Sequence, residues 1–194
     1  MNLSPEALLS GYMQGAFPMA QPDGRIYWYS PDPRAILPLD GLHVSQSLRR
    51  VIHRGRFEVR FNTAFAEVVA ACAAPAPGRP STWISAEIAA AYTNLHRLGL
   101  AHSVETWLDG ELAGGLYGVS LRGLFAGESM FSRQRDASKV ALYYLVVRLR
   151  ERGFELLDVQ FQTPHLERLG AIEISRRHYL RLLRRALAAD SRFD

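Results

Sequence analysis

The sequence has one cysteine, Cys72, among 194 residues, which excludes an internal disulfide and any zinc site built from several cysteines. A reducing compartment is compatible with that scarcity. No apolar stretch approaches the roughly 18 residues that a membrane-spanning helix needs. The first residues, MNLSPEALLS, lack the basic and apolar regions of a signal peptide. We therefore expect a cytoplasmic protein without a membrane partner.

Histidine spacing typical of metal sites is also lacking. The six histidines are His43, His53, His96, His102, His165 and His178. None of them forms H-E-x-x-H or another recognised ligand spacing. We expect no metal ion.

Lysine is nearly absent, because only one of the 23 basic residues is a lysine. The formal net charge is +4, and arginine is concentrated in two places. Residues 49–60 contain five arginines and one acid, and residues 176–185 contain five arginines and no acid. Such patches could attract a polyanion such as RNA. Taken alone, a solvated arginine-rich helix face is the plainer interpretation.

The remaining composition, 48% hydrophobic and 22% charged, is that of an ordinary globular domain. Ser4 and Pro5 predict a first helix that runs to about Gln14. The following segment, QPDGRIYWYSPDPRAILP, is expected to be an irregular connection, because its prolines prevent a regular helix. Apolar spacing predicts helices at 45–55, 63–73 and 85–99, a strand at 57–61, and a loop at PAPGRP, residues 75–80.

The second half predicts a β-meander followed by a crossover. Turns at residues 109–110 and 122–123 separate three expected strands at about 102–108, 111–119 and 123–128. A long helix, a strand at 154–160, a short helix, a short strand and a terminal helix follow. This order predicts an α+β fold with a mostly antiparallel central sheet flanked by helices, the connectivity of N-acetyltransferase-type folds. We divide the chain into a helical and irregular N-terminal segment, 1–44, and a main domain, 45–194.

The segment GLFAGESMFSRQRDASK, residues 123–139, contains the first candidate reactive groups. GESMF begins like the nucleophile elbow G-x-S-x-G, but Phe131 replaces the second glycine, so Ser129 is a poor candidate nucleophile. Residues 133–138 are not the glycine-rich loop that binds the phosphates of coenzyme A, and Asp136 would repel them. We expect no coenzyme A and no other cofactor.

Two carboxylates remain as candidates. Glu128 is expected at the end of the third meander strand, and Asp158 on the strand after the long helix. Alternation would place Asp158 and Gln160 on one face of that strand. If the two strands are neighbours, all three side chains could line one cleft. An acid in an apolar strand is costly unless it is paired or functional, and pairing of Glu128 with an arginine such as Arg133 is the alternative.

Several stretches, in this order, closely resemble leucyl/phenylalanyl-tRNA–protein transferases: GYMQGAFPM, YWYSPDPRAILP, TWIS, LGLAHSVETW, GGLYGV, GESMFSR-x-x-x-ASK and LLDVQ-x-x-x-x-H-x-x-x-LGA. They cover most of residues 8–182. The resemblance implies an acetyltransferase-like (GNAT-type) core without coenzyme A, in an enzyme of the N-degron pathway of protein degradation. It would transfer Leu or Phe from Leu-tRNA or Phe-tRNA to proteins that begin with Arg or Lys. The chain looks like a short form without the full N-terminal extension of longer members.

The resemblance also implies roles for individual residues. Asp158 and Gln160 match the family's aspartate-x-glutamine pattern, which is implicated in activating the acceptor amine, and Glu128 matches the glutamate of GES. The two carboxylates would also select a cationic acceptor. Candidates for binding the donor end are Tyr12, Phe17, Met19, Leu116, Met130 and Phe131. Candidates for holding the tRNA by its phosphates are Arg49, Arg50, Arg54 and Arg56.

Two positions depart from the family pattern, and two other functions stay open. Met19 stands where the family usually has tryptophan, and Leu116 where it usually has methionine. A coenzyme-A-dependent N-acetyltransferase is the alternative among enzymes, and a non-catalytic RNA-binding module is the alternative from another class. The sequence leaves the oligomeric state open, a monomer included.

Overall fold

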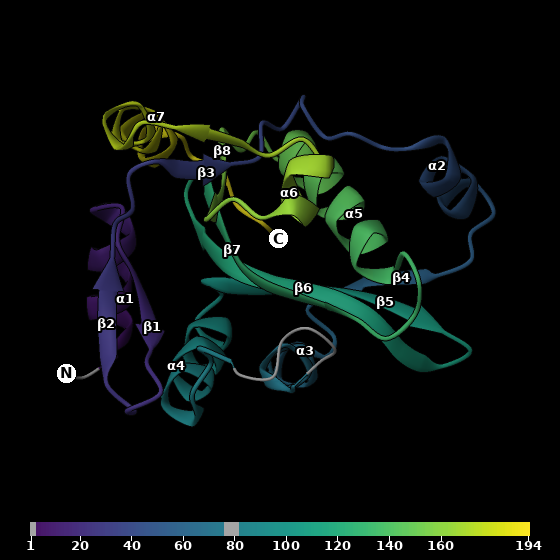
Figure 1. The fold of residues 1–194 in the computed structure, drawn as a ribbon, viewed down its shortest axis with the longest axis horizontal. Coiled ribbons are helices and arrows are strands. Elements are labelled where there is room, and N and C mark those ends of the chain that lie inside the picture. Colours follow the sequence, from purple (N-terminus) through teal and green to yellow (C-terminus); the bar gives the residue numbers. More distant parts are fainter. Residues whose placement is uncertain (1–2, 76–81) are drawn as a thin grey trace.

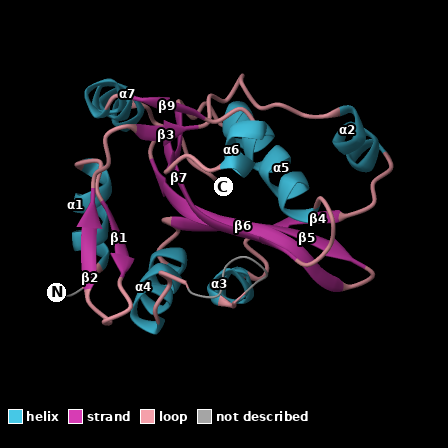
Figure 2. Cartoon of the chain, in the orientation of Figure 1, coloured by secondary structure: helices cyan, strands magenta, loops and turns pink. Residues whose placement is uncertain are grey.

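The computed structural model describes residues 3–75 and 82–194 of the chain. A seven-stranded sheet with strand order β4-β5-β6-β7-β8-β3-β9 crosses the molecule, and helices cover both of its faces (Figure 1). A second sheet, β1-β2, packs beside α1 at one end (Figure 2). The predicted α+β class with a mostly antiparallel sheet is confirmed.

The helices in the described residues are α1 (Pro5–Met13), α2 (Gln46–His53), α3 (Phe65–Ala73), α4 (Ala86–Arg97), α5 (Ala137–Glu151), α6 (Pro164–Arg168) and α7 (Arg176–Ala188). The strands are β1 (Phe17–Ala20), β2 (Ile26–Tyr29), β3 (Arg34–Ile36), β4 (Glu58–Phe61), β5 (Ala101–Leu108), β6 (Glu111–Leu121), β7 (Leu124–Ser132), β8 (Leu156–Gln160) and β9 (Ile172–Ile174). The loop predicted at 75–80 lies, apart from Pro75, outside the described residues.

Local signals explain most helix boundaries. The hydroxyl groups of Ser4, Ser45, Ser85, Thr163 and Ser175 each accept a hydrogen bond from a backbone N–H in the first turn of the following helix. This is the preferred way to satisfy amide groups that have no partner inside a helix. These caps are the reason that the sequence predicted these helices close to their observed starts.

The predicted meander is present, with one difference that concerns the site. β7 continues to Ser132, so Glu128 lies inside this strand and not at its end, as the sequence had suggested. Along β6 and β7, Tyr117 faces Ser129 while Gly118 faces Gly127, which leaves Glu128 as an extra residue in a β-bulge. A bulge bends its strand and re-aims side chains without ending the strand, and bulges are frequent beside active sites.

The predicted crossover joins β7 to β8 through α5, and the two strands pair in parallel. Their pairing begins at Leu124 with Leu156 and ends at Ala126 with Asp158. Beyond this point the strands separate while β7 continues through the bulge. The opening between them is where the candidate site lies.

Three strands were missed, because β1, β2 and β3 all lie in or beside the segment expected to be irregular. They have only 3 or 4 residues each, and β3 owes its strand conformation to pairing with β8 and β9. Such short strands are specified by their neighbours more than by their own sequence. The division into residues 1–44 and 45–194 stays a prediction.

One face of the sheet also holds a C-terminal aromatic anchor. The ring of Phe193 is 2% exposed and lies 4.2 Å from the ring of His102 and 5.4 Å from that of Phe125, measured between centroids. The guanidinium of Arg148 lies 4.9 Å from the same ring centroid, and its Nε donates a 2.8 Å hydrogen bond to the Phe193 carbonyl. Phe193 is therefore part of the core, whereas Arg192 and Asp194 on either side of it are exposed.

We expect Phe193→Ala to lower the free energy of unfolding by about 3–5 kcal/mol, because it leaves a cavity between the sheet and α5. Urea unfolding followed by circular dichroism measures the change. Leu98→Ala, at a side chain that is 57% exposed, is the matched control and should change stability by less than about 0.5 kcal/mol. Equal effects of the two substitutions would contradict this role of Phe193.

Candidate active site

The opening between β7 and β8 contains a pocket of about 210 Å³. Much of its wall is apolar and includes Leu116, Met130, Leu142, Leu145 and Leu157. Polar groups line the rest, chiefly Glu128, Gln160, Thr163 and His165. A largely apolar cavity with a few converging polar groups is the usual form of a small-molecule site.

Glu128 is the carboxylate that reaches this pocket, and two tyrosines hold it. Tyr12 donates a 2.6 Å hydrogen bond to Oε1, and Tyr92 donates a 3.1 Å hydrogen bond to Oε2. The two hydroxyl groups also contact each other. Because α1 supplies Tyr12 and α4 supplies Tyr92, the carboxylate depends on two helices far apart in the sequence. No arginine pairs with Glu128 within 3–75 and 82–194, and Arg133 instead lies 5.5 Å from the ring centroid of Phe131.

Burial raises the pKa of Glu128 to about 7, because an ionised carboxylate loses hydration in the protein interior. The hydrogen bonds from Tyr12 and Tyr92 and the positive charge of Arg34 act in the opposite direction, and the charge of Asp158 adds to the rise. Burial also raises the pKa of both tyrosines well above 10, so they remain hydrogen-bond donors. A carboxyl group with a pKa near neutrality can both accept and release a proton.

Asp158 has a different environment, because it is completely buried against Arg34. Arg34 Nε lies 2.9 Å from Oδ1, and Nη2 lies 2.6 Å from Oδ2, so the ion pair is bidentate. The hydroxyl of Tyr179 donates to Oδ2 at 2.9 Å, and the backbone N–H of Gln160 donates to Oδ1 at 3.0 Å. Both oxygens are thus occupied within the protein, and Asp158 does not line the pocket.

Gln160 lines the pocket although Asp158, two residues earlier, does not. The backbone φ of Gln160 is 61°, in the left-handed region, which breaks the strand alternation on which the sequence prediction relied. The expectation that Asp158 and Gln160 share one face is therefore wrong. The side-chain Nε2 of Gln160 is buried and has no hydrogen-bond partner among the described residues. A buried donor without a partner is costly, which suggests that a ligand satisfies it.

The six residues expected at the donor end do not all meet at this pocket. Leu116 and Met130 line it. Tyr12 reaches it only through Glu128. Phe131 packs in the core cluster that includes Phe65 and Tyr117 and does not line the pocket.

The other two donor-end candidates lie on β1. The ring of Phe17 covers the guanidinium of Arg34, with 4.7 Å from Cζ to the ring centroid. Met19 faces Tyr27 in the two-stranded sheet.

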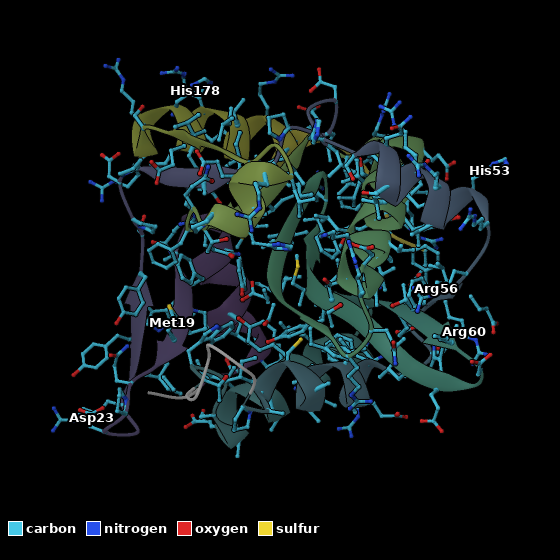
Figure 3. All side chains as sticks on the ribbon, turned by 45° about the vertical axis from the view of Figure 1, so that its right-hand side comes forward. Met19, Asp23, His53, Arg56, Arg60 and His178 are labelled. Atoms are coloured by element: carbon cyan, nitrogen blue, oxygen red, sulfur yellow. The ribbon has the colours of Figure 1, made fainter. Side chains whose placement is uncertain are left out.

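The four arginines expected to bind tRNA gather at the opposite end of the molecule from β1. Arg49 and Arg50 lie on α2, and Arg54 and Arg56 follow it. All four are exposed, and they form no ion pair within the described part of the chain. Figure 3 shows Arg56 and His53 at the outer edge of this end, with Met19 on the far side. The structure thus separates these arginines from the two-stranded sheet β1-β2, which contains Phe17 and Met19.

Sequence reasoning missed Arg34, Tyr92 and Tyr179. Arg34 belongs to YWYSPDPRAILP, one of the stretches that resemble the family. Nothing in the neighbouring sequence identified it as the partner of Asp158, 124 positions away. Tyr92 and Tyr179 occur in helices with ordinary apolar spacing. Only their contacts in three dimensions separate them from core tyrosines.

No group of three or more His, Cys, Asp or Glu side chains within 3–75 and 82–194 is arranged to hold a metal ion. In the same ranges, no helix is both long and apolar enough to cross a bilayer.

Two family models match the chain, and between them they span most of it. The model described as leucyl/phenylalanyl-tRNA protein transferase matches residues 36–184. The model of that family's N-terminal domain matches residues 1–32.

Curated relatives are similar over the full chain. A leucyl/phenylalanyl-tRNA–protein transferase from Herpetosiphon aurantiacus is 60% identical over 99% of this chain and 98% of its own. Proteins of the same name from Gloeobacter violaceus and Rubrobacter xylanophilus are each 57% identical over 100% of this chain, and over 98% and 100% of their own.

Solved structures are more distant. A ribosomal-protein-alanine N-acetyltransferase from Brucella melitensis has a TM-score of 0.40 at 17% identity, covering 57% of this chain and 84% of its own. L-PGS from Bacillus licheniformis has a TM-score of 0.47 at 12% identity, covering 95% of this chain and 70% of its own.

We expect Arg34→Met to lower the free energy of unfolding by about 3–5 kcal/mol, because it leaves the Asp158 carboxylate buried without a counter-ion. Asp158→Leu alone should have a similar effect, and the double variant should lose clearly less than the sum, since neither charge then remains. Chemical denaturation of the four proteins measures this coupling. Arg25→Met, at an ion pair with Asp23 whose arginine is 76% exposed, should change stability little. Additive losses at positions 34 and 158 would contradict the role assigned to the pair.

The raised pKa of Glu128 predicts a specific pH dependence of stability. The folded pKa of about 7 exceeds the ordinary 4.5, so the folded protein binds this proton more tightly than the unfolded chain does. The resulting stabilisation is complete below pH 4.5 and is lost as the pH rises through 7. Relative to Glu128→Gln, whose amide does not titrate, the unaltered protein should lose on the order of 2 kcal/mol between about pH 5 and pH 8. Denaturant unfolding across this range measures the difference, with Glu111→Gln at the exposed first residue of β6 as control. Parallel curves for the unaltered protein and Glu128→Gln would exclude the shift.

Proposed function

The chain belongs to the leucyl/phenylalanyl-tRNA protein transferase family, and from this premise we propose that it transfers Leu or Phe from an aminoacyl-tRNA to the N-terminal α-amine of an acceptor protein. One observation carries the proposal. Among the described residues, the pocket between β7 and β8 is lined largely by apolar side chains, by one carboxylate, Glu128, and by Gln160, whose side-chain Nε2 has no hydrogen-bond partner there.

The apolar wall suits the donor side chain. Leucine and phenylalanine side chains present no polar atom to satisfy, and the side chains of Leu116, Met130 and Leu145 offer only hydrocarbon and thioether surface. A charged or amide side chain in that position would be buried without a partner, which costs several kcal/mol. Such a pocket selects apolar aminoacyl groups of suitable size.

The reaction is the aminolysis of an ester. The acceptor nitrogen forms a bond to the carbonyl carbon, the bond from that carbon to the terminal ribose oxygen breaks, and the proton lost by the amine is balanced by the proton gained by the ribose hydroxyl. As the carbon becomes tetrahedral, negative charge develops on the carbonyl oxygen. We assign the side-chain amide of Gln160, whose Nε2 has no hydrogen-bond partner among the described residues, as the donor to that oxygen.

Glu128 is placed to handle the acceptor amine. With a pKa of about 7 it can take the amine proton at neutral pH, and its negative charge favours the cationic end of the acceptor. Selection of proteins that begin with Arg or Lys, as the resemblance implies, is compatible with this charge. Asp158 offers less to the acceptor, because Arg34 already compensates its charge. We assign it the task of fixing Gln160 through the 3.0 Å bond to the Gln160 N–H.

The remaining proposals concern the setting of the reaction. The exposed Arg49, Arg50, Arg54 and Arg56 supply phosphate contacts that do not read sequence. The reaction takes place in the cytoplasm, where aminoacyl-tRNA is found, and marks acceptors for the N-degron pathway. All the groups assigned here come from one chain, and we propose that it acts as a monomer.

A transfer assay tests the function. Labelled Leu-, Phe- and Asp-tRNA are combined with peptides that begin with Arg, Lys, Asp or Ala. We expect transfer from Leu-tRNA and Phe-tRNA to the Arg and Lys peptides. Glu128→Gln should lower kcat/KM by about 10²-fold or more, while Arg49→Glu with Arg50→Glu should act mainly on KM for the tRNA.

Other outcomes point to the alternatives. If Glu128→Gln leaves the biological activity unchanged while the arginine reversals abolish it, the chain is an RNA-binding module. Calorimetric binding of acetyl-coenzyme A, together with no transfer from any aminoacyl-tRNA, would establish the N-acetyltransferase alternative instead.

A further inference from the structure

A second cavity adjoins the candidate active site. It measures about 310 Å³, and His165 lines both cavities. The other polar residues around it are His43, Ser45, Lys139 and Arg168. These side chains come from three separate parts of the chain: the segment before α2, the first turn of α5, and α6 with the residues beside it. No acidic residue lines the cavity among the residues that the structure describes.

The positive charge around this cavity is only partly compensated. Arg168 forms no ion pair within residues 3–75 and 82–194. Lys139 pairs with Asp136 at 2.9 Å, and its side chain remains 37% exposed. The pKa of His165 is lowered by burial and further by the charges of Lys139 and Arg168. Both positive charges therefore lie near the His165 side chain. An anion there would pair with Arg168, which has no ionic partner among the described residues, and with the exposed part of Lys139.

The cavity also lies on a route to the arginine patch. In the extended segment 42–45, His43 and Ser45 line this cavity, whereas Leu42 and Val44 line a separate hollow that also includes Arg49, Arg50 and Arg54. Alternation in an extended chain sends successive side chains to opposite sides. The segment therefore separates two basic cavities, and the first of them shares a wall with the aminoacyl pocket.

We propose that the cavity formed by His43, Lys139, His165 and Arg168 binds a phosphodiester of the tRNA 3′ end, next to the esterified terminal nucleoside. The proposal rests on the proposed function. The nearest phosphate to the aminoacyl ester lies one nucleoside away, so a cationic subsite beside the aminoacyl pocket is where it would be expected. Lysine and arginine are suited to phosphate oxygens as a point charge and as a planar pair of donors, respectively. This contact orients the donor ester and reads no base.

Three donors of increasing size test the proposal. Phenylalanyl-adenosine has no phosphate, the phenylalanyl ester of cytidylyl-adenosine has one phosphodiester, and Phe-tRNA has the full acceptor arm. For Lys139→Met and Arg168→Gln, we expect KM to rise about tenfold with the two phosphate-bearing donors. KM and kcat with phenylalanyl-adenosine should stay within about twofold of the unaltered protein, which also shows that the variants are folded.

Arg135→Gln is the matched control. Arg135 also lies near Asp136, at 3.7 Å, and its side chain is 88% exposed, but it does not line the cavity. It should leave all three donors unchanged if the cavity is the site. Equal losses with all three donors for Lys139→Met and Arg168→Gln, or no loss with any of them, would overturn the phosphate site.

A binding measurement separates this proposal from the proposed function. Calorimetry with non-aminoacylated cytidylyl-adenosine and with adenosine requires no transfer reaction. The dinucleotide should bind more tightly than adenosine only if Lys139 and Arg168 are intact. Equally tight binding of inorganic phosphate alone would indicate a free-anion site and would contradict the assignment to tRNA. If phosphate-dependent binding persists while no donor supports transfer, the proposed function fails and the subsite stands.

Discussion

The buried ion pair between Arg34 and Asp158 connects the parts of the protein that form the site. Arg34 comes from the N-terminal segment and Asp158 from the strand beside the pocket, and neither side chain is more than 1% exposed. Removing two charges from water is costly, and this geometry offsets the cost with two direct hydrogen bonds and rings on either side of the guanidinium. The Arg34 Cζ lies 4.7 Å from the ring centroid of Phe17 and 4.4 Å from that of Tyr179. Arg34 Nη1 also donates to the carbonyl of Gly15 at 2.9 Å, which ties the end of α1 to the same point.

The consequences of this pair extend to both reactive groups. Besides Arg34 and Tyr179, Asp158 accepts a hydrogen bond from the backbone N–H of Gln160, whose φ is left-handed and whose side chain lines the pocket. Arg34 also holds the end of α1 through the Gly15 carbonyl, and Tyr12 of this helix donates its hydrogen bond to Glu128. Glu128 itself lies in a bulge of β7, where it is buried and forms no ion pair with any described residue. One carboxylate is thus neutralised and structural, and the other keeps a pKa near neutrality.

The start of α5 bears on which acyl donor the protein can bind. Asp136 occupies the start of α5, where an enzyme that uses coenzyme A would place bare amides for phosphates, and its carboxylate contacts Lys139 at 2.9 Å. The cavity whose positive charge is only partly compensated lies between the first turn of α5, α6 and the segment before α2. If the proposed subsite holds a phosphodiester, the backbone of the donor runs from the aminoacyl pocket past His165 toward the arginines of α2. A polyanion that continues beyond one nucleotide fits this direction.

The sequence by itself determined the helices with serine and threonine caps, the meander with its two-residue turns, the crossover through α5, and the presence of Glu128, Asp158 and Gln160 as candidates. These features depend on contacts within a few residues, or on residue patterns that persist along the chain. Only the tertiary structure decided that Asp158 faces Arg34, that two tyrosines hold Glu128, that Phe131 packs away from the pocket, and that residues 17–36 form short strands. Each of these results depends on a partner distant in the sequence, or on one left-handed residue and one bulge, and neither periodicity nor composition records such contacts.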